Sequence, residues 1–360
     1  MPMSKLIGLT YDLKSDWQIR EGDPVDINAE FDSLETIERI EKALCKGGHT
    51  VMRIGSAWRL LSMIDHLKAD IIFNICEGRG PRSRESQVPM LLEMKGIPFV
   101  GADALSQAIT LDKIMAKKLF IADGIPTPRF FEAQSGDDLE KINSIGFPLI
   151  VKTRHEGTSK GISAKSRVED TSSLKRQVAL INHTYKQTAL VEEFIRGMEF
   201  TVPVLGNRHP EAMPIVQMNM GGKENPGDEF YTFEKVVAHS VQYICPAKIS
   251  KKLTEELQYW AVKAYQSVEC RDFGRVDFRV DEKGNLYVLE INPLPNLGEG
   301  ESFDLFPKVL GLTYDEVINQ ILNFALERYG LMETPLKRRI KTPETTKKIN
   351  KEQVSEASVV

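Results

Sequence analysis

The chain has 360 residues, of which 41% are hydrophobic and 27% are charged, and its formal net charge is −4. This balance excludes a broad basic surface for nucleic acid, and no apolar run approaches the length of a membrane span. The length exceeds that of one typical core, so we expect two or three packed units, with neither nucleic acid nor membrane as a partner.

The four cysteines, Cys45, Cys76, Cys245 and Cys270, are far apart and form no Cys-x-x-Cys pair. This spacing argues against zinc and against a disulfide framework, and favours reduced thiols in the cytoplasm. The first residues lead into a short apolar strand rather than the apolar core of a signal peptide.

Residues 5–107 alternate between short apolar strands and amphipathic helices. Strands are predicted at 5–10, 51–54, 70–76 and 97–100, and helices at 34–44, 58–68 and 88–95. Asp32 is the expected N-cap of the first helix, with Glu35 three residues later. This alternation predicts an open, doubly wound α/β domain.

In such a sheet, ligands bind beyond the carboxyl ends of the strands, where Cys76–Gly80 and Ser83–Ser86 fall. A glycine-rich surface loop with scattered charge fits these residues equally well. The chain has no Gly-x-Gly-x-x-Gly after its first strand, which argues against a dinucleotide site.

A second unit is predicted to begin with a helix over 111–120. A strand over 147–151 follows and leads through Lys152 into the loop Glu156–Ser163. The backbone N–H groups of such a loop can wrap phosphates while Lys152 neutralises their charge. The loop is not a Walker A sequence, and a loop rich in serine and glycine can equally be a plain connection.

The second half of the chain returns to strands, at 190–195 and 199–205. Residues 218–240 are rich in glycine, asparagine and charge, and are expected to form a mobile loop. Helices are predicted at 253–268 and 314–329 from their apolar stripes, with a loop over 293–302. Residues 336–360 lose periodicity and carry seven Lys or Arg between 337 and 351, so we expect a disordered tail.

A hairpin is predicted over 275–292, turning at Asp281–Gly284. Side chains two apart share a face of a strand, so Arg275 joins Asp277, and Glu290 joins Asn292. Tyr287, Leu289 and Ile291 are expected on the opposite face. The carboxylate and amide oxygens suit Mg²⁺, although the hairpin alone is equally consistent with a solvated polar face.

Taken in order, these blocks resemble the D-alanine–D-alanine ligase family of ATP-grasp enzymes over roughly residues 5–330. The matching blocks are Gly96–Gly101, Leu111–Lys113 with Lys117 and Lys118, Phe147–Lys152, Glu156–Ser163, Val191–Glu199, Arg275–Phe278 and Glu290–Pro295. The resemblance implies an ATP-grasp fold of the α/β class, with α+β organisation in the C-terminal half. It implies an N-terminal unit over 1–108, a central unit over 109–189 and a C-terminal unit over 190–333, followed by a charged tail over 334–360.

The resemblance also implies ATP held between the sheets of the central and C-terminal units. The implied ATP-binding residues are Lys113, Lys152, Thr158, Ser159, Gly161, Glu192, Glu193, Phe194, Ile195 and Glu199. Asp277, Glu290 and Asn292 are implied to hold two Mg²⁺ ions, with Mn²⁺ as an alternative. The implied catalytic residues are Arg275, which would stabilise an oxyanion, together with Lys235, Thr158 and Ser159.

The family phosphorylates a carboxylate with ATP and joins the acyl phosphate to an amine, so the resemblance implies an ATP-dependent carboxylate–amine ligase. The N-terminal segment Cys76–Glu85 and the loop Asn296–Ser302 depart from the family's pattern. The family's Tyr-Glu-Ala-Lys-Tyr pattern corresponds here to Phe233–Val236, in which Lys235 is displaced by one position. The nearest matches for substrate contacts are Glu30, Glu77, Arg84 and Ser302.

The expected substrates are therefore a small amino-acid-like acid and an amine. D-alanine–D-alanine ligation is the leading named activity, followed by a biosynthetic ligase acting on other substrates. A non-catalytic ATP-binding regulatory or scaffold protein is the alternative from another class. The resemblance also suggests a homodimer formed through the N-terminal unit.

Overall fold

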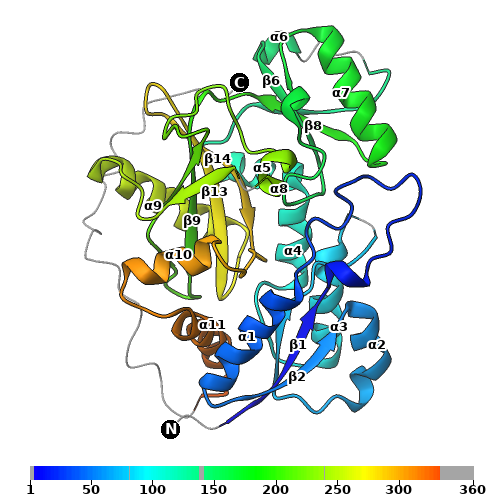
Figure 1. The fold of residues 1–360 in the computed structure, drawn as a ribbon, viewed down its shortest axis with the longest axis vertical. Coiled ribbons are helices and arrows are strands. Elements are labelled where there is room, and N and C mark those ends of the chain that lie inside the picture. Colours follow the sequence, from blue (N-terminus) through cyan, green and yellow to red (C-terminus); the bar gives the residue numbers. More distant parts are fainter. Residues whose placement is uncertain (1–3, 81, 138–141, 239, 333–360) are drawn as a thin grey trace.

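The computed structural model describes residues 4–332 apart from 81, 138–141 and 239. The charged tail expected over 334–360 lies outside this range. Three sheets follow one another along the chain (Figure 1). The first is parallel and has four strands, and the other two are antiparallel sheets of four and six strands.

The N-terminal sheet has the strand order β2-β1-β3-β4, with every pair parallel. Its strands are β1 (Leu6–Tyr11), β2 (Thr50–Gly55), β3 (Ile71–Ile75) and β4 (Phe99–Val100). β3 is apolar except for Asn74 and is buried on both faces, with Ile71 and Phe73 on one side and Ile72 on the other. The open α/β arrangement predicted from the sequence is confirmed.

Helices from both ends of the chain cover this sheet. One face packs against α1 (Leu34–Lys46), α10 (Ser302–Val309) and α11 (Tyr314–Arg328), and the other against α2 (Ala57–Met63) and α3 (Gln87–Lys95). Figure 1 shows α11 lying beside α1. The N-terminal core is therefore completed by helices from the C-terminal end.

The predicted N-cap of α1 is wrong by one residue. The side chain of Ser33, rather than that of Asp32, accepts the backbone N–H of Thr36 at 3.3 Å. The helix predicted over 111–120 corresponds to α5 (Lys113–Ala122), which begins two residues later, and the helix α4 (Ala104–Leu111) before it was not predicted. Asp112 separates them, because its carboxylate caps α5 by accepting the backbone N–H of Met115.

The central sheet has the order β5-β8-β6-β7, and α7 (Thr171–Thr184) packs on one face. Its strands are β5 (Phe130–Ala133), β6 (Leu149–Thr153), β7 (Arg167–Val168) and β8 (Ala189–Glu193), and α6 (Ile142–Ile145) precedes β6. Because β8 pairs with β5 and β6, it crosses the boundary expected at 189/190. We propose that the central unit ends after Glu193, and the other boundaries stay predictions.

The C-terminal sheet has the order β12-β11-β9-β13-β14, with β10 paired to β9. Its strands are β9 (Gly197–Leu205), β10 (Glu211–Ala212), β11 (Val216–Met220), β12 (Val241–Ile244), β13 (Phe273–Asp281) and β14 (Leu286–Asn292). α9 (Lys251–Ser267) and α5 pack on one face. The segment 218–240 was expected as a loop, but it includes the end of β11 and the short helix α8 (Phe233–Val237).

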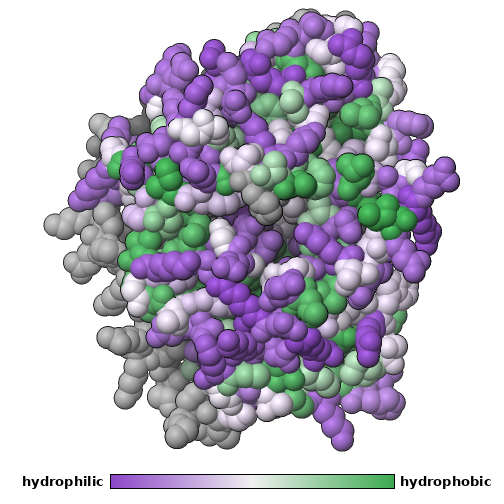
Figure 2. Space-filling view, viewed as in Figure 1, coloured by the Kyte–Doolittle hydropathy of each residue, from purple (hydrophilic) through white to green (hydrophobic). Residues whose placement is uncertain are grey.

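Short 3-10 helices occur at Lys14–Asp16, Ile64–His66, Arg84–Ser86 and Ala164–Ser166. Hydrophilic side chains cover most of the face shown in Figure 2, and hydrophobic ones lie in separate groups. Within the described part of the chain, no helix has the length and apolar character needed to cross a membrane.

Candidate active site

A cleft lies between the central and C-terminal sheets, and alternate residues of four strands face it. In β13, Val276 and Phe278 pack into the core while Arg275 and Asp277 line the cleft. The same period of two applies to β6, β9 and β11. The strand residues that line the cleft are Ile150, Lys152, Glu192, Glu193, Glu199, Thr201, Val216, Met218, Tyr243, Arg275, Asp277, Arg279, Leu289 and Glu290.

A second cavity, of about 490 Å³, adjoins the cleft on the side of the N-terminal unit. Both cavities reach Lys113, Arg275 and Glu290, so these residues stand at the junction. The junction is where a group bound in the cleft could react with a molecule bound in the second cavity.

The hairpin of β13 and β14 brings its polar residues together at this junction. Asp277 lies directly opposite Glu290, and Arg275 lies opposite Asn292. The carboxylate of Asp277 accepts from both Nε and a terminal nitrogen of Arg275, at 3.0 and 2.9 Å. It also accepts from the amide of Asn292 at 3.0 Å, so the convergence predicted from the period of two is confirmed.

A bulge in β14 corrects one part of that prediction. The register shifts so that Phe278 pairs with Val288 after Asp277 has paired with Glu290, which leaves Leu289 unpaired. Val288 and Ile291 therefore both face the core, while Leu289 turns into the cleft. The expected common face of Tyr287, Leu289 and Ile291 is wrong for this reason.

Positive charge surrounds Glu290. The Lys113 ammonium lies 3.4 Å from its carboxylate. Burial raises the pKa of Glu290, but the charges of Lys113 and Lys152 outweigh burial and lower it. The side chain therefore remains a carboxylate, able to bind a cation.

A buried ion-pair cluster lies deeper in the cleft. Glu192 pairs with Lys152 and, at 2.9 Å, with Lys117. Burial raises the pKa of Glu192, yet the two ammonium groups outweigh burial and lower it to about 2. The cluster fixes Lys152 on the wall of the cleft in its charged form.

The loop after β6 enters the cleft in an unusual backbone conformation. Thr158 and Ser159 have φ values of 45° and 57°, in the left-handed region that is unfavourable for residues other than glycine. Such conformations cluster where the backbone meets a ligand. Both residues line the cleft.

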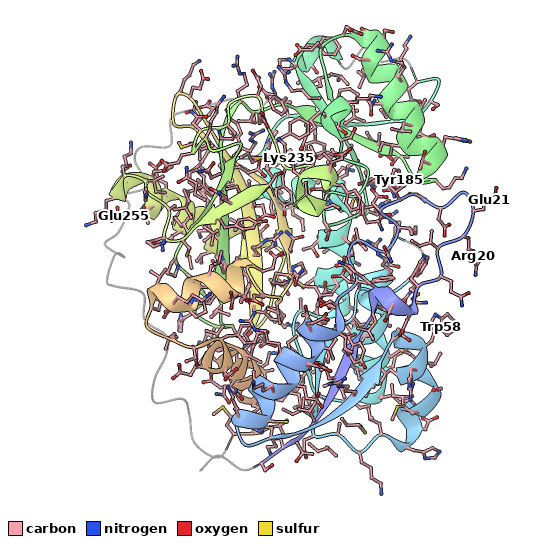
Figure 3. All side chains as sticks on the ribbon, in the orientation of Figure 1. Arg20, Glu21, Trp58, Tyr185, Lys235 and Glu255 are labelled. Carbon is pink, nitrogen blue, oxygen red and sulfur yellow. The ribbon has the colours of Figure 1, made fainter. Side chains whose placement is uncertain are left out.

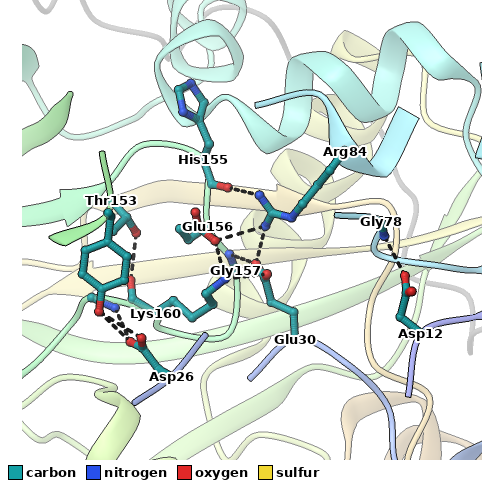
Figure 4. Close-up of polar contacts among 12 residues, drawn as sticks. Asp12, Asp26, Glu30, Gly78, Arg84, Thr153, His155, Glu156, Gly157 and Lys160 are labelled. Carbon is teal, nitrogen blue, oxygen red and sulfur yellow. Dashed lines mark hydrogen bonds and ion pairs between the residues drawn. The ribbon is translucent and has the colours of Figure 1, made fainter. Parts of the chain in front are cut away.

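The N-terminal unit holds this loop in place (Figure 4). The carboxylate of Asp26 accepts the backbone N–H of Gly161 at 2.8 Å. The carboxylate of Glu30 accepts the backbone N–H of Gly157 and pairs with Lys160 at 3.0 Å. The loop is therefore anchored at both ends to residues that precede α1.

Comparison with known proteins identifies the family. A family model described as "D-ala D-ala ligase C-terminus" matches residues 119–323. A D-alanine–D-alanine ligase of Carboxydothermus hydrogenoformans is 31% identical over 304 residues, which span 82% of this chain and 94% of the relative. The chain belongs to the D-alanine–D-alanine ligase family. It is an ATP-dependent ligase of the D-alanine–D-alanine ligase type.

Two further proteins extend this comparison. An uncharacterised protein, y4sG, of Sinorhizobium fredii is 38% identical over 261 residues, or 72% of this chain and 75% of that protein. The D-alanine–D-alanine ligase of Bacillus anthracis complexed with ATP superimposes with a TM-score of 0.70 at 20% identity, covering 91% of this chain and 99% of that one. The expected ATP-grasp fold is thus confirmed.

Most of the residues expected from the resemblance to this family lie together. The cleft is lined by Lys113, Lys152, Thr158, Ser159, Glu192, Glu193, Ile195, Glu199, Arg275, Asp277, Glu290 and Ser302. The second cavity is lined by Glu30, Glu77 and Asn292. The roles assigned to these residues stay predictions.

The remaining expected residues lie outside the cavity walls described here. Lys235, labelled in Figure 3, pairs with Glu229 and donates to the Phe230 carbonyl at 3.1 Å. Phe194 packs edge-on against Phe230, with ring centroids 5.6 Å apart. Gly161 is engaged by Asp26, and Arg84 by Glu30.

Sequence reasoning did not assign several residues of the two cavities and of the buried ion-pair cluster at Glu192. Arg279 could have been found, because it is two residues beyond Asp277 on the same strand face. Lys117 stood within a matching block, but its approach to Glu192 depends on packing between α5 and β8. Glu85 and Glu301 lie within Ser83–Ser86 and Asn296–Ser302, two segments that the sequence analysis singled out, but nothing in the sequence distinguishes these residues from their neighbours there.

Proposed function

We propose that the enzyme joins the carboxylate of a small amino acid to the amine of a second one, through an acyl phosphate. The observation that carries this proposal is the junction of the two cavities at Lys113, Arg275 and Glu290. A nucleotide in the cleft would present its terminal phosphate to a carboxylate in the second cavity.

In this proposal ATP lies in the cleft with its adenine against β8 and its phosphates under the loop Glu156–Ser163. Ile150 and Met218 offer apolar surface for the base from opposite walls. Glu199 would hold the ribose, and Lys113 and Lys152 would neutralise the phosphates. The backbone N–H groups near Thr158 and Ser159 suit phosphate oxygens.

We further propose that Asp277, Glu290 and Asn292 bind Mg²⁺, in agreement with the oxygen-only character of this set. No group of three or more His, Cys, Asp or Glu side chains is arranged as a metal site among the described residues; this set instead combines two carboxylates with one amide. The fork of Arg275 balances the charge of Asp277 in the present structure. A divalent ion held by these three residues would supply positive charge beside the phosphates during the transfer.

The proposed reaction has two steps. A carboxylate oxygen of the first substrate bonds to the γ-phosphorus of ATP while the bond to the bridging oxygen breaks, and ADP leaves. The amine of the second substrate then bonds to the acyl carbon, the carbon–oxygen bond to phosphate breaks, and the proton from nitrogen passes to the departing phosphate. Arg275 is placed to stabilise the negative oxygen of the tetrahedral intermediate.

The related ligases are named for D-alanine, and we propose two D-alanine molecules as the first substrate pair to test. Purified protein with Mg²⁺ and ATP should release ADP with D-alanine or with members of an amino-acid panel, and mass spectrometry should find the matching dipeptide. Normal ATP binding without ADP release above background for any acid and amine would refute the ligase assignment.

We also propose a homodimer formed through the N-terminal unit. Trp58 on α2 and Met94 on α3 are 67% and 75% exposed, and Leu61 and Met90 lie on the same two adjacent helices. Figure 3 shows Trp58 at the outer edge of the molecule. Exposed apolar groups of this kind are typical of protein contacts. Trp58→Glu should convert the dimer into monomer in analytical ultracentrifugation.

A further inference from the structure

The second cavity is lined by more acidic side chains than basic ones. Seven acidic side chains and three basic ones line it. Several of the acids are already matched: Glu290 by Lys113, and Glu156 by Lys160. Among the described residues, four lining carboxylates have no such partner: Asp32, Glu77, Glu85 and Glu301. Glu77 and Glu85 are the two that lie in the segment Cys76–Ser86 of the N-terminal unit.

Glu30, the expected partner of a substrate ammonium, is already engaged. Its carboxylate pairs with Arg84 at 2.6 Å and with Lys160 at 3.0 Å, and accepts the backbone N–H of Gly157 (Figure 4). Burial raises the pKa of Glu30, but these partners outweigh burial and lower it. A substrate ammonium would have to compete with three donors at this carboxylate.

Glu85 differs from Glu30 in having none of these contacts. It is 8% exposed and lines the cavity, yet no described residue hydrogen-bonds to its carboxylate or pairs with it. Burial raises the pKa of Glu85 to about 7, although the charge of Arg84 acts in the other direction. A buried carboxylate without a partner is costly, so this environment favours a cation from outside the chain.

Glu77 repeats this pattern beside Glu85. It lines the same cavity, and no hydrogen bond or ion pair to its carboxylate comes from the described part of the chain. Burial and the neighbouring charge of Glu85 both raise the pKa of Glu77 well above its ordinary value. Two bound cationic groups would offset the energetic cost of burying these two carboxylates and would reduce the repulsion between them.

The cavity also has room for more than alanine. Its volume of about 490 Å³ lies within the range of roughly 300–1,000 Å³ that is typical of sites for larger ligands. The positive charge of Lys113, which lies at the junction with the cleft, acts on the carboxyl group of Glu85. An acid bound with its carboxylate at the junction would therefore extend its amino groups toward Glu77 and Glu85.

We propose that the carboxylate substrate carries two cationic amino groups, as a diamino monocarboxylic acid does, and that Glu77 and Glu85 bind them. This inference rests on the proposed ligase function. It deepens that function by naming the class of acid that is phosphorylated.

The test compares acids matched in carbon number, in both enantiomers: ornithine against norvaline, and lysine against norleucine. With Mg-ATP and an amine panel, kcat/KM for ADP release should be at least about tenfold higher for the diamino acid of a matched pair. Ornithine labelled with heavy oxygen in its carboxylate should transfer one label to the released phosphate. If both labelled oxygens instead remain in the product, ornithine has supplied the amine and not the activated carboxylate. That outcome would overturn the proposal.

Substitutions of Glu77 and Glu85 test whether these two residues cause the preference for a diamino acid. Glu85→Gln and Glu77→Gln should each lower the ornithine-to-norvaline ratio of kcat/KM by about tenfold, whereas the exposed Glu21→Gln should leave it unchanged. The ratio reports selectivity even in a variant with reduced overall activity. An unchanged ratio in both variants would refute the assignment of these two carboxylates.

Binding separates this inference from the ligase function. Calorimetry with a non-hydrolysable ATP analogue should show tighter binding of ornithine than of norvaline, without turnover. If no acid and amine release ADP but ornithine binds preferentially, the ligase assignment fails and the diamino-acid site stands. If neutral acids are turned over and bound as well as diamino acids, the ligase stands and this inference fails.

Discussion

At the scale of single residues, the proposed metal ligand Glu290 gives a prediction about catalysis. Glu290→Gln keeps the shape of the side chain but removes the charge opposite Asp277. We expect turnover to fall on the order of 10³-fold, because charge developing on the phosphates would lose its divalent counter-ion. The measurement is steady-state ADP release at saturating ATP.

The matched control is Glu282→Gln, an exposed residue in the turn of the same hairpin. It removes the same charge at a distance from the junction and should retain wild-type turnover. Equal activities of the two variants would contradict the assignment of Glu290 to the metal site.

The buried Glu192 gives a prediction about stability. Glu192→Gln leaves Lys117 and Lys152 without their counter-ion, and removing one partner of a buried ion pair costs about 3–5 kcal/mol. Glu193→Gln, one residue along β8, breaks only an exposed pair with Arg129 and should cost less than about 1 kcal/mol. Urea unfolding of both variants at neutral pH measures the difference.

The same residue sets a pH dependence. Its folded pKa of about 2 lies below its ordinary 4.5, so its contribution to stability is complete above the ordinary value. That contribution is lost as the pH falls from about 4.5 toward about 2. The stability difference between wild type and Glu192→Gln should therefore shrink over this interval. A difference that stays constant would contradict the ion-pair origin.

At the scale of secondary structure, the sequence identified the elements whose pattern is local. The hairpin was found because Val276, Phe278 and Val280 alternate with polar residues, and α11 because of its apolar stripe. The bulge at Leu289 could not be found, since it depends on how β14 pairs with β13 rather than on the sequence of either strand. The engagement of Glu30 is hidden for a similar reason: Arg84 and Lys160 are 54 and 130 residues away.

Two glycines with positive φ can be compared: Gly197 at the start of β9, and Gly284 in the turn between β13 and β14. Gly197 and Gly284 both have positive φ, at 143° and 87°. A Cβ at Gly197 would lie 2.0 Å from the carbonyl oxygen of Val280, whereas one at Gly284 would meet open space. Gly284→Ala should cost about 1–2 kcal/mol for its backbone conformation, and Gly197→Ala about 4 kcal/mol or more.

Thermal unfolding followed by circular dichroism distinguishes these two substitutions. The larger fall in midpoint is expected for Gly197→Ala, because β9 must separate from β13 to admit the methyl group. Equal midpoints would show that the backbone contact at Val280 relaxes without cost.

At the scale of the whole molecule, α11 ties the two ends of the chain into one core. Ile321 is fully buried on α11, in the cluster that contains Ile7 of β1 and Ile40 of α1. Ile321→Ala should destabilise the protein by about 2–5 kcal/mol and loosen the N-terminal sheet, although β1 is more than 300 residues away in sequence. Hydrogen exchange should therefore speed up in β1.

The exposed Glu327→Ala on the same helix is the control, and should leave exchange in β1 unchanged. If exchange after Ile321→Ala rises only in the C-terminal sheet, the N-terminal core is independent of α11. The sequence could not indicate this dependence, since the apolar stripe of α11 shows that one face is buried but not against which partner.

The anchoring of the loop Glu156–Ser163 by Asp26 has a consequence for the efficiency of ATP use in the proposed reaction. An acyl phosphate is lost to water if the loop lifts before the amine arrives. Asp26 holds the loop through Gly161 and through the hydroxyl of Tyr185, at 2.8 Å to each. Asp26→Ala should therefore raise the ratio of ADP released to amide formed several-fold, whereas the exposed Asp16→Ala should keep it near one. A ratio of ADP to amide near one in both variants would show that contacts other than those of Asp26 keep water out.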